Sequence, residues 1–502
     1  MSVNTLLENV KTRHKASVIL LAVIVFLHGF WGTKAGAASI FDSSKVDQYI
    51  EQAMERLHIP GASIGIVKGD KIMYVKGYGI TGPNREPVTP QTPFVLGSTS
   101  KSITALATMQ LVDEGKIKLD APVQQYLPWF RLADEIASAK ITVKDLLQQT
   151  SGISTYEGKA TLVSDDIPLD DFIRKMKDVS LAKPVGAEYQ YSNLNYAILG
   201  AIIQTIANQP FGDYVKERIF TPLNMRNSTA YIEEAKRYGL ATGHQPIFGL
   251  VVPTQIMNRI AGVPDGSLIS SAEDMSNYLI AQMNGGRFEN RMLLSETSVH
   301  KMHKPAVFTG DETYYGMGWG IKGNIIEHSG ATENSSSYLM IDGEYGVVLL
   351  FNSMDYMVSY DQIPLEISKV LHGGNPSVDE LPSFKATYLV IDVIAFVVVA
   401  MYIVSLRRLF QWKGTYHQMT RLRTIIQSTA LVLLNILVPF VILLGLPAFL
   451  VPWPVALEFL PGIAHFLLIF PVLLLAVGMI KGVRMLSVVV KDIRTNHLQK
   501  LL

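Results

Sequence analysis

Ser98 and Lys101 have the residue types and the spacing of a nucleophile and its base. They stand three positions apart, directly after an apolar run that ends at Gly97. If a helix begins at Ser98, the hydroxyl and the ammonium lie on the same face. A serine hydroxyl is a weak nucleophile until a nearby base accepts its proton. Burial and the positive end of a helix both favour neutral lysine, so this position suits a lysine base.

The same serine–lysine spacing occurs twice more. Ser180 and Lys183 form one pair, but a proline follows the lysine and makes helical geometry unfavourable there. Ser298 and Lys301 form the other, in a polar segment that we expect to be a surface helix. Only Ser98 follows an extended run at a strand-to-helix junction.

Two further motifs carry groups that could take part in the same chemistry. Tyr191 and Asn193 form the sequence's single Tyr-x-Asn, in a loop before a helical pattern. A phenol can carry a proton if a nearby ammonium lowers its pKa, although a packed tyrosine with an asparagine cap is the alternative. An apolar run ends at His328 and Gly330, where a substrate could approach the backbone and N–H groups could bind an oxyanion. A structural histidine is the alternative at His328.

The composition narrows the possible functions. The 502 residues exceed one average domain, and the net charge of +1 does not suggest a nucleic-acid partner. The sequence has no cysteine, which rules out disulfides, thiolate catalysis and cysteine metal sites.

The N-terminus predicts export. Three basic residues precede an apolar run at residues 16–31, and small residues follow. This pattern predicts a signal peptide over residues 1–37, cleaved after Ala37, with an uncleaved anchor as the alternative. Either reading sends the following domain out of the cytoplasm.

Residues 38–371 are predicted to form one globular unit. A β-hairpin is expected at 62–67 and 72–78, and strand-like runs return at 338–341 and 346–352. Helical patterns occupy the sequence between and before these runs, at 46–57, 143–149, 169–176, 195–207 and 272–283, the last with Ser271 as a cap. A sheet built from both ends of the unit, with helices inserted, indicates an α+β architecture.

The C-terminal part is predicted to be a membrane domain. Residues 372–385 have the composition of a linker, and 386–502 contain three apolar stretches, at 386–406, 425–446 and 457–480. The first connecting loop has five basic residues and no acidic one, and the tail has five basic residues and one acidic residue. The positive-inside rule therefore places this loop and the tail in the cytoplasm and the globular unit outside.

The motifs, in this order, resemble the penicillin-recognising serine hydrolases, in the branch of class C β-lactamases, D-alanyl-D-alanine carboxypeptidases and related esterases and peptidases. The resemblance covers about residues 39–371. It includes LLQQTSG at 146–152, PDGSLISSAED at 264–274 and YGMGW at 315–319. It implies an α/β sandwich with a central antiparallel sheet joined to an all-helical region, with the site at the junction.

The resemblance also implies residue roles. Ser98 would be the acylated nucleophile, Lys101 its base and Tyr191 the proton shuttle. The substrate-binding residues would be Asn193, His328, Gly330 and Ala331, with the oxyanion held by the N–H groups of Ser98 and Ala331. Gln149 stands where the family often has histidine. No cofactor or metal is implied.

Three C-terminal spans resemble the membrane-bound peptidases that remove an N-acyl-D-asparagine cap from nonribosomal prodrugs. In those proteins an asparagine near the position of Asn334 contacts the D-asparagine side chain. The sequence thus predicts an extracytoplasmic, membrane-anchored serine hydrolase acting on an amide of a D-amino-acid peptide. Its partners would be a small peptide, cell-wall peptide or β-lactam-like substrate and the lipid bilayer. The alternatives are the cap-removing peptidase and an acylated sensor with little turnover.

Overall fold

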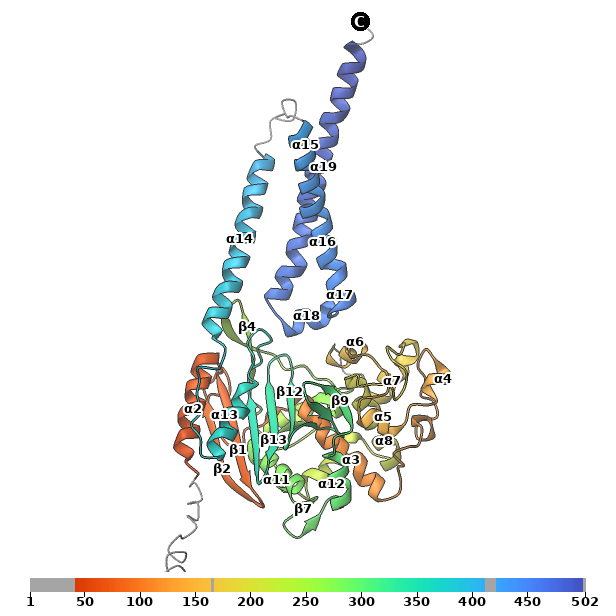
Figure 1. The fold of residues 1–502 in the computed structure, drawn as a ribbon, viewed down its shortest axis with the longest axis vertical. Helices are drawn as coiled ribbons and strands as arrows, with labels where there is room; N and C mark the ends of the chain where they lie inside the picture. Colours follow the sequence, from red (N-terminus) through yellow and green to blue (C-terminus); the bar gives the residue numbers. More distant parts are fainter. Residues whose placement is uncertain (1–40, 164–166, 411–420, 500–502) are drawn as a thin grey trace, which may run out of the picture.

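The computed structural model describes residues 41–163, 167–410 and 421–499. The predicted signal peptide at residues 1–37 lies outside this described part. Figure 1 shows a globular part at one end and a bundle of long helices that extends from it. The globular part contains all of the motifs discussed above.

An eight-stranded antiparallel sheet forms the centre of the globular part, in the order β2-β1-β14-β13-β12-β11-β10-β9. Its strands are β1 (Gly61–Lys68), β2 (Lys71–Gly79), β9 (Val307–Gly310), β10 (Thr313–Tyr315), β11 (Gly320–Lys322), β12 (Ile325–Ala331), β13 (Ser336–Asp342) and β14 (Tyr345–Phe351). The first strand pairs with the last, with Ile64 opposite Leu349. The prediction of an α+β fold whose sheet is built from both ends of the unit is therefore confirmed.

Helices cover both faces of this sheet and create two hydrophobic cores (Figure 1). Because side chains alternate along a strand, Val347 and Leu349 of β14 enter one core, whereas Val348 and Leu350 enter the other. The first core lies under α2 (Ser43–Leu57) and α13 (Gln362–Leu371), and the second under α3 (Ser100–Asp113) and α11 (Ala272–Met283).

A helical region adjoins the second core. Its main helices are α5 (Val143–Leu147), α7 (Leu169–Arg174), α8 (Asn193–Ala207) and α9 (Phe211–Val215). Shorter elements complete the globular part: α4 (Glu135–Ser138), α6 (Thr155–Gly158), α10 (Ile232–Arg237), α12 (Glu296–Met302), and the paired strands β3 (Phe94–Val95) with β6 (Ile269–Ser270), β4 (Gly243–Ile247) with β5 (Leu250–Thr254), and β7 (Arg287–Phe288) with β8 (Arg291–Met292). The predicted cap is present, since the Ser271 hydroxyl accepts from the Asp274 amide at the start of α11.

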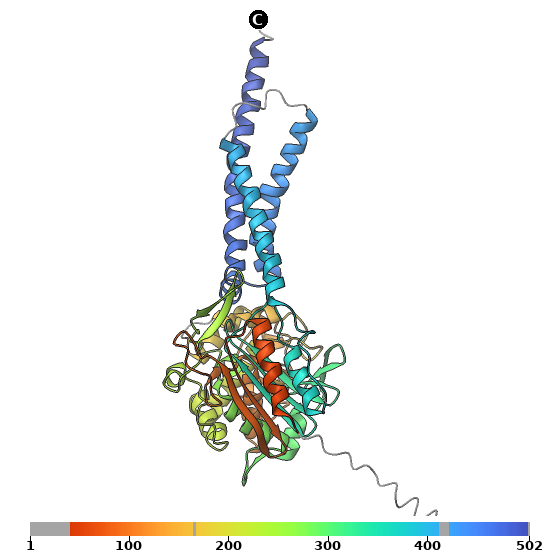
Figure 2. The same ribbon diagram turned by 90° about the vertical axis from the view of Figure 1, so that its left-hand side faces the viewer.

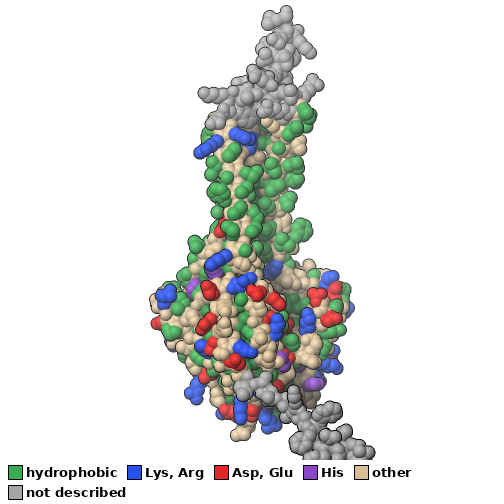
Figure 3. All heavy atoms as spheres, turned by 60° about the vertical axis from the view of Figure 1, so that its left-hand side comes forward, with side chains coloured by type: hydrophobic (Ala, Val, Ile, Leu, Met, Phe, Trp, Pro, Cys, Tyr) green, Lys and Arg blue, Asp and Glu red, His purple; other side chains and the backbone are tan. Residues whose placement is uncertain are grey.

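Three helical segments are long and apolar enough to cross a membrane, at Phe384–Phe410, Ile425–Phe449 and Ile463–Ser487. They are built from α14 (Phe384–Phe410), then α15 (Arg421–Val432), α16 (Val438–Phe440) and α17 (Leu446–Phe449), and finally α19 (Ile463–Gln499). Hydrophobic side chains cover the visible face of this bundle, and charged side chains are spread over the globular part (Figure 3).

The start of the third span differs from the prediction. The apolar pattern indicated a span from residue 457, but the chain forms a separate short helix there, α18 (Trp453–Phe459). Pro461 cannot donate a backbone hydrogen bond, and Gly462 adopts a φ of 80°, so the helix ends and α19 begins at Ile463. Figure 1 shows α18 at the end of the bundle that faces the globular part.

The segment predicted to be a linker is packed against the globular part. Leu381 and Phe384 are buried, and the Phe384 ring stacks on His58 with their centroids 4.2 Å apart. One turn further, the buried Tyr388 donates its hydroxyl hydrogen to Asp355 Oδ1 over 3.1 Å. Helix α14 therefore begins inside the first core and rises from the globular part beside α2 (Figure 2).

Candidate active site

Ser98 lies in a 3₁₀ turn, η1 (Gly97–Thr99), and helix α3 begins two residues later at Ser100. The turn is tight because Gly97 adopts a φ of 57°. A Cβ atom at this glycine would lie 2.4 Å from the Ala331 amide nitrogen. The missing side chain therefore allows the nucleophile turn to approach the edge of β12.

Hydrogen bonds hold this turn against the sheet. The Leu96 carbonyl accepts from the hydroxyls of Thr99 (2.9 Å) and Ser337 (2.5 Å). The Thr99 and Ser337 hydroxyls also contact each other over 2.9 Å. All of these groups are buried, so the position of Ser98 is fixed on both sides.

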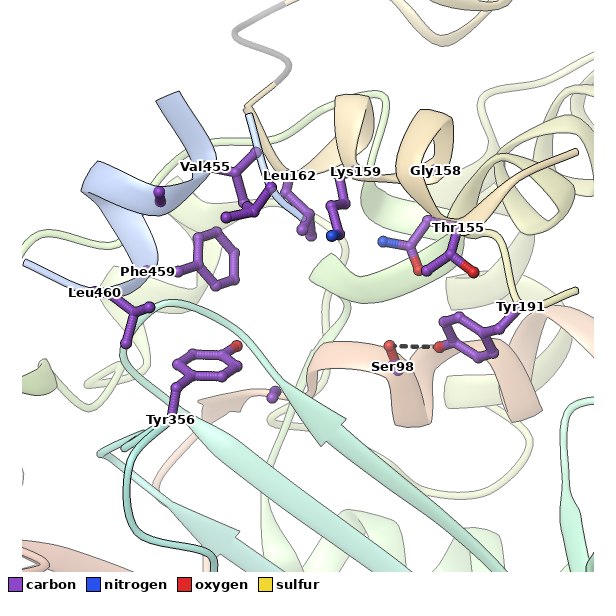
Figure 4. Close-up of a pocket in the computed structure, with 14 residues that line it drawn as sticks. Ser98, Thr155, Gly158, Lys159, Leu162, Tyr191, Tyr356, Val455, Phe459 and Leu460 are labelled. Atoms are coloured by element: carbon purple, nitrogen blue, oxygen red, sulfur yellow. Dashed lines mark hydrogen bonds between the residues drawn. The ribbon is translucent and has the colours of Figure 1, made fainter. Parts of the chain in front are cut away.

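The structure brings the three predicted catalytic residues together. Ser98 Oγ accepts hydrogen bonds from Lys101 Nζ over 3.0 Å and from the Tyr191 hydroxyl over 2.9 Å, the latter drawn in Figure 4. Lys101 Nζ also donates to Asn193 Oδ1 over 2.9 Å and to the Asp265 carbonyl over 2.6 Å. The serine hydroxyl is therefore within proton-transfer distance of an amine and a phenol.

Burial determines which of these groups can act as a base. Lys101 is 0% exposed, and the loss of hydration lowers its pKa to about 8, although the Asp265 carboxylate opposes this shift. Burial raises the pKa of Tyr191. This shift is opposite in direction to the lowering of the phenol pKa that a nearby ammonium would cause. The phenol stays protonated, and neutral Lys101 is the stronger candidate for the base.

Gln149 positions the loop that carries Tyr191. It adopts a φ of 61°, and its side-chain oxygen accepts from the Ser192 amide (2.9 Å) and from Asn195 Nδ2 (2.5 Å). Its carbonyl accepts from the Gln190 amide over 2.8 Å. Gln149 thus ties the loop to the first turn of α8, a role that the sequence did not predict.

The other two serine–lysine pairs have no comparable geometry. Lys183 lies outside the helices and pairs with Glu188 over 2.7 Å. The Ser298 hydroxyl donates to Asp113 Oδ1 over 2.6 Å, and Lys301 is exposed. The preference for Ser98 based on its context is therefore consistent with the structure.

The end of β12 approaches the nucleophile turn. A Cβ atom at Gly330 would lie 2.1 Å from the Leu96 carbonyl oxygen and 3.0 Å from the Ser98 amide nitrogen. A Cβ atom at Gly97 would in turn lie 2.4 Å from the Ala331 amide nitrogen. The two N–H groups predicted for the oxyanion hole, those of Ser98 and Ala331, therefore lie on facing segments.

His328 is buried, and its ring contacts Tyr315 and the backbone of Ser329. Its Nε2 lies 3.3 Å from the Tyr315 hydroxyl, and its Nδ1 lies 2.7 Å from the Ser329 carbonyl oxygen. Burial lowers the pKa of His328 to about 4, with a further contribution from Lys101, so the imidazole is neutral at neutral pH. His328 does not line either of the two described cavities that contain Ser98.

Asn334 is hydrogen-bonded to the end of β5. Its side-chain nitrogen donates to Thr254 Oγ1 and to the Gln255 carbonyl, each over 3.1 Å, and its side chain is fully buried. It lines neither described cavity that contains Ser98. The carboxamide nitrogen therefore secures the end of β5, and the D-asparagine contact stays a prediction.

A cavity of about 330 Å³ opens beside Ser98 (Figure 4). Tyr191, Asn193 and Ala331 line it together with side chains from α18. Ser98 also lines a smaller cavity, together with Asp265 and Arg259. Among the described residues, no group of three or more histidine or acidic side chains could hold a metal ion.

Three buried ionisable groups near the site, Arg259, Glu333 and Asp265, were not predicted from the sequence. Arg259 and Glu333 form an ion pair over 2.7 Å with side chains that are 4% and 0% exposed. Asp265 is buried, and its pKa is raised to about 7 by desolvation. Asp265 lies within the quoted PDGSLISSAED stretch, so that motif was its available signal.

Comparisons with known proteins give a consistent result. The family model described as beta-lactamase matches residues 46–370. Protein flp of Staphylococcus aureus is 29% identical over 314 residues, which are 61% of this chain and 62% of the relative. Penicillin-binding protein 4 of Amycolatopsis lactamdurans is 30% identical over 325 residues, covering 61% of this chain and 84% of that protein. The chain thus matches under two thirds of the length of the Staphylococcus relatives.

Solved structures agree with this match. The octameric penicillin-binding protein homologue from Pyrococcus abyssi superposes with a TM-score of 0.59 at 30% identity, over 68% of this chain and 79% of that one. EstCE1, a hydrolase with promiscuous acyltransferase activity, superposes with a TM-score of 0.58 at 20% identity, over 66% and 98%. The second likeness concerns the fold alone.

Proposed function

Because the chain belongs to the beta-lactamase family of serine hydrolases, we propose that it cleaves an amide of a D-amino-acid-containing peptide through an acyl-enzyme. One observation carries this proposal: a single serine oxygen, Ser98 Oγ, lies within 3.0 Å of both the Lys101 amine and the Tyr191 hydroxyl. The first group supplies a base at moderate pH, and the second supplies a proton donor beside the same oxygen.

The proposed reaction has two halves. Neutral Lys101 accepts the Ser98 proton as Oγ attacks the scissile carbonyl, and the N–H groups of Ser98 and Ala331 stabilise the oxyanion. The C–N bond then breaks, and the leaving amine takes its proton from Tyr191, which is reprotonated from the Lys101 ammonium. In the second half, water loses a proton to Lys101 and attacks the acyl-enzyme. The ester C–O bond breaks, the Lys101 ammonium returns the proton to Ser98 Oγ, and the acid is released.

We also propose that the catalytic unit works outside the cytoplasm, anchored by the three apolar helices. The support comes from the basic residues of the loop between the first two spans and of the tail. The start of α15, which follows this loop, lies at the end of the bundle distant from the globular part (Figure 1). Protease accessibility of the globular part in intact cells would test this topology.

Covalent labelling tests the chemistry. A fluorescent penicillin or a fluorophosphonate probe should label the full-length protein, and Ser98→Ala should abolish labelling. Ser298→Ala is the matched control, because it removes a serine of the same Ser-x-x-Lys spacing outside the site. Undiminished labelling of the Ser98 variant would refute the nucleophile assignment. A penicillin adduct that never turns over would indicate a sensor instead of a hydrolase.

A further inference from the structure

The connection between the second and third spans lies across the mouth of the active site. The Tyr156 hydroxyl donates to the Pro447 carbonyl over 2.6 Å at the end of α17. Gln245 Nε2 donates to the Glu458 carbonyl over 2.7 Å within α18. These bonds tie both ends of the connection to the globular part.

Side chains of this connection line the same cavity as the nucleophile. Val455 and Phe459 project from α18 toward the cavity of about 330 Å³ that contains Ser98 (Figure 4), and Ala456 also lines this cavity. Leu162 contributes an apolar side chain to the lining from the globular part. The cavity has the size of a small-molecule site, and its wall beside the polar catalytic groups is hydrocarbon.

The α18 wall is held in place by groups that do not themselves react. The Phe459 ring lies 5.7 Å from the Tyr356 ring and 5.7 Å from the Arg259 guanidinium. Arg259 is fixed by its buried ion pair with Glu333 and donates from Nε to the Leu162 carbonyl over 2.6 Å. A wall fixed in this way can select a substrate without first being ordered by it.

We infer that α18 is a specificity-determining wall, and that the substrate carries an apolar group next to its scissile bond that packs against Val455, Ala456 and Phe459. This inference rests on the proposed acyl-enzyme function. An apolar group in this cavity leaves water and contacts hydrocarbon on the α18 side, whereas a small or charged group gains nothing there. Each methylene buried in this way should increase the acylation rate constant about fourfold.

The test measures how acylation depends on chain length, using the full-length protein in detergent micelles. One probe series varies the alkyl chain of a fluorophosphonate, and a second varies the acyl chain of a nitrophenyl ester from acetyl to octanoyl. We expect the wild-type protein to prefer the long chain in one of the two series. Ala456→Phe fills the cavity and should reduce that long-to-short preference about tenfold or more.

Variants on the same helix provide the controls. Phe459→Ala enlarges the cavity and should move the preferred chain length upward, whereas Leu457→Ala should leave the preference unchanged, because Leu457 does not line the described cavity. Equal rates for long and short probes in the wild type, with no effect of Ala456→Phe, would overturn the role of α18 while leaving the proposed hydrolase intact. No Ser98-dependent labelling by any probe would overturn both.

Discussion

The pH dependence of acylation follows from the burial of Lys101. With a pKa of about 8, roughly one tenth of the Lys101 amines are neutral at pH 7, against about 0.03% for a lysine with an ordinary pKa. Burial therefore increases the population of the base roughly 300-fold at neutral pH. We expect the acylation rate constant to rise tenfold per pH unit below about pH 8 and to level off above it.

The assay is the second-order rate of fluorophosphonate labelling between about pH 6 and about pH 10, with Ser98→Ala subtracted as background. Asp265→Asn provides a signed test, since the Asp265 carboxylate raises the Lys101 pKa. Removing this negative charge disfavours the ammonium, so the midpoint should move to lower pH. A midpoint near that of free lysine, or a shift upward in the Asp265 variant, would refute Lys101 as the buried base.

Three further changes have defined expected outcomes. Asn193→Asp replaces the amide oxygen 2.9 Å from Lys101 Nζ with a carboxylate, so the lysine pKa should rise and labelling at pH 7 should fall by about tenfold or more. Gly330→Ala directs a methyl group at the Leu96 carbonyl and should reduce acylation by about 10²–10³-fold through the oxyanion hole, measured as the labelling rate of folded protein. Glu333→Gln leaves its guanidinium partner buried and unpaired, and should destabilise the protein by about 3–5 kcal/mol in thermal unfolding.

The sequence predicted the features that depend on local spacing. Ser98 and Lys101 are three residues apart, and the 3₁₀ turn that leads into α3 brings their side chains together much as a helix beginning at Ser98 would. Short apolar runs identified the strands of the hairpin and the last two strands, including β14, whose side chains divide between two cores. Tyr191 is distant from Ser98 along the chain, and its role was anticipated through the family resemblance.

Contacts between distant segments could not be predicted in this way. The Gln149 contacts and the Arg259–Glu333 pair depend on how loops meet in three dimensions, and no periodicity encodes them. The end of α18, from residue 457, was assigned to the third span because its composition is apolar. In the structure the same hydrophobicity faces a cavity, and hydropathy does not distinguish these two environments. The same limit applies to Asn334, since its sequence position does not reveal which way its side chain points.

Because residues 381–388 pack into the globular part, the hydrolase cannot be separated cleanly from α14, the first of the three apolar helices. Leu381, Phe384 and Tyr388 are buried in the core beneath α2, and Asp355 keeps a hydroxyl partner only while the second turn of α14 is present. A recombinant protein truncated after the last strand would leave that core open, and the exposed apolar surface would favour aggregation. A soluble version should therefore retain α14 to about Ile391 and replace the outward-facing apolar residues of that stretch with polar ones. Recombination of this catalytic unit with other anchors in evolution would face the same constraint.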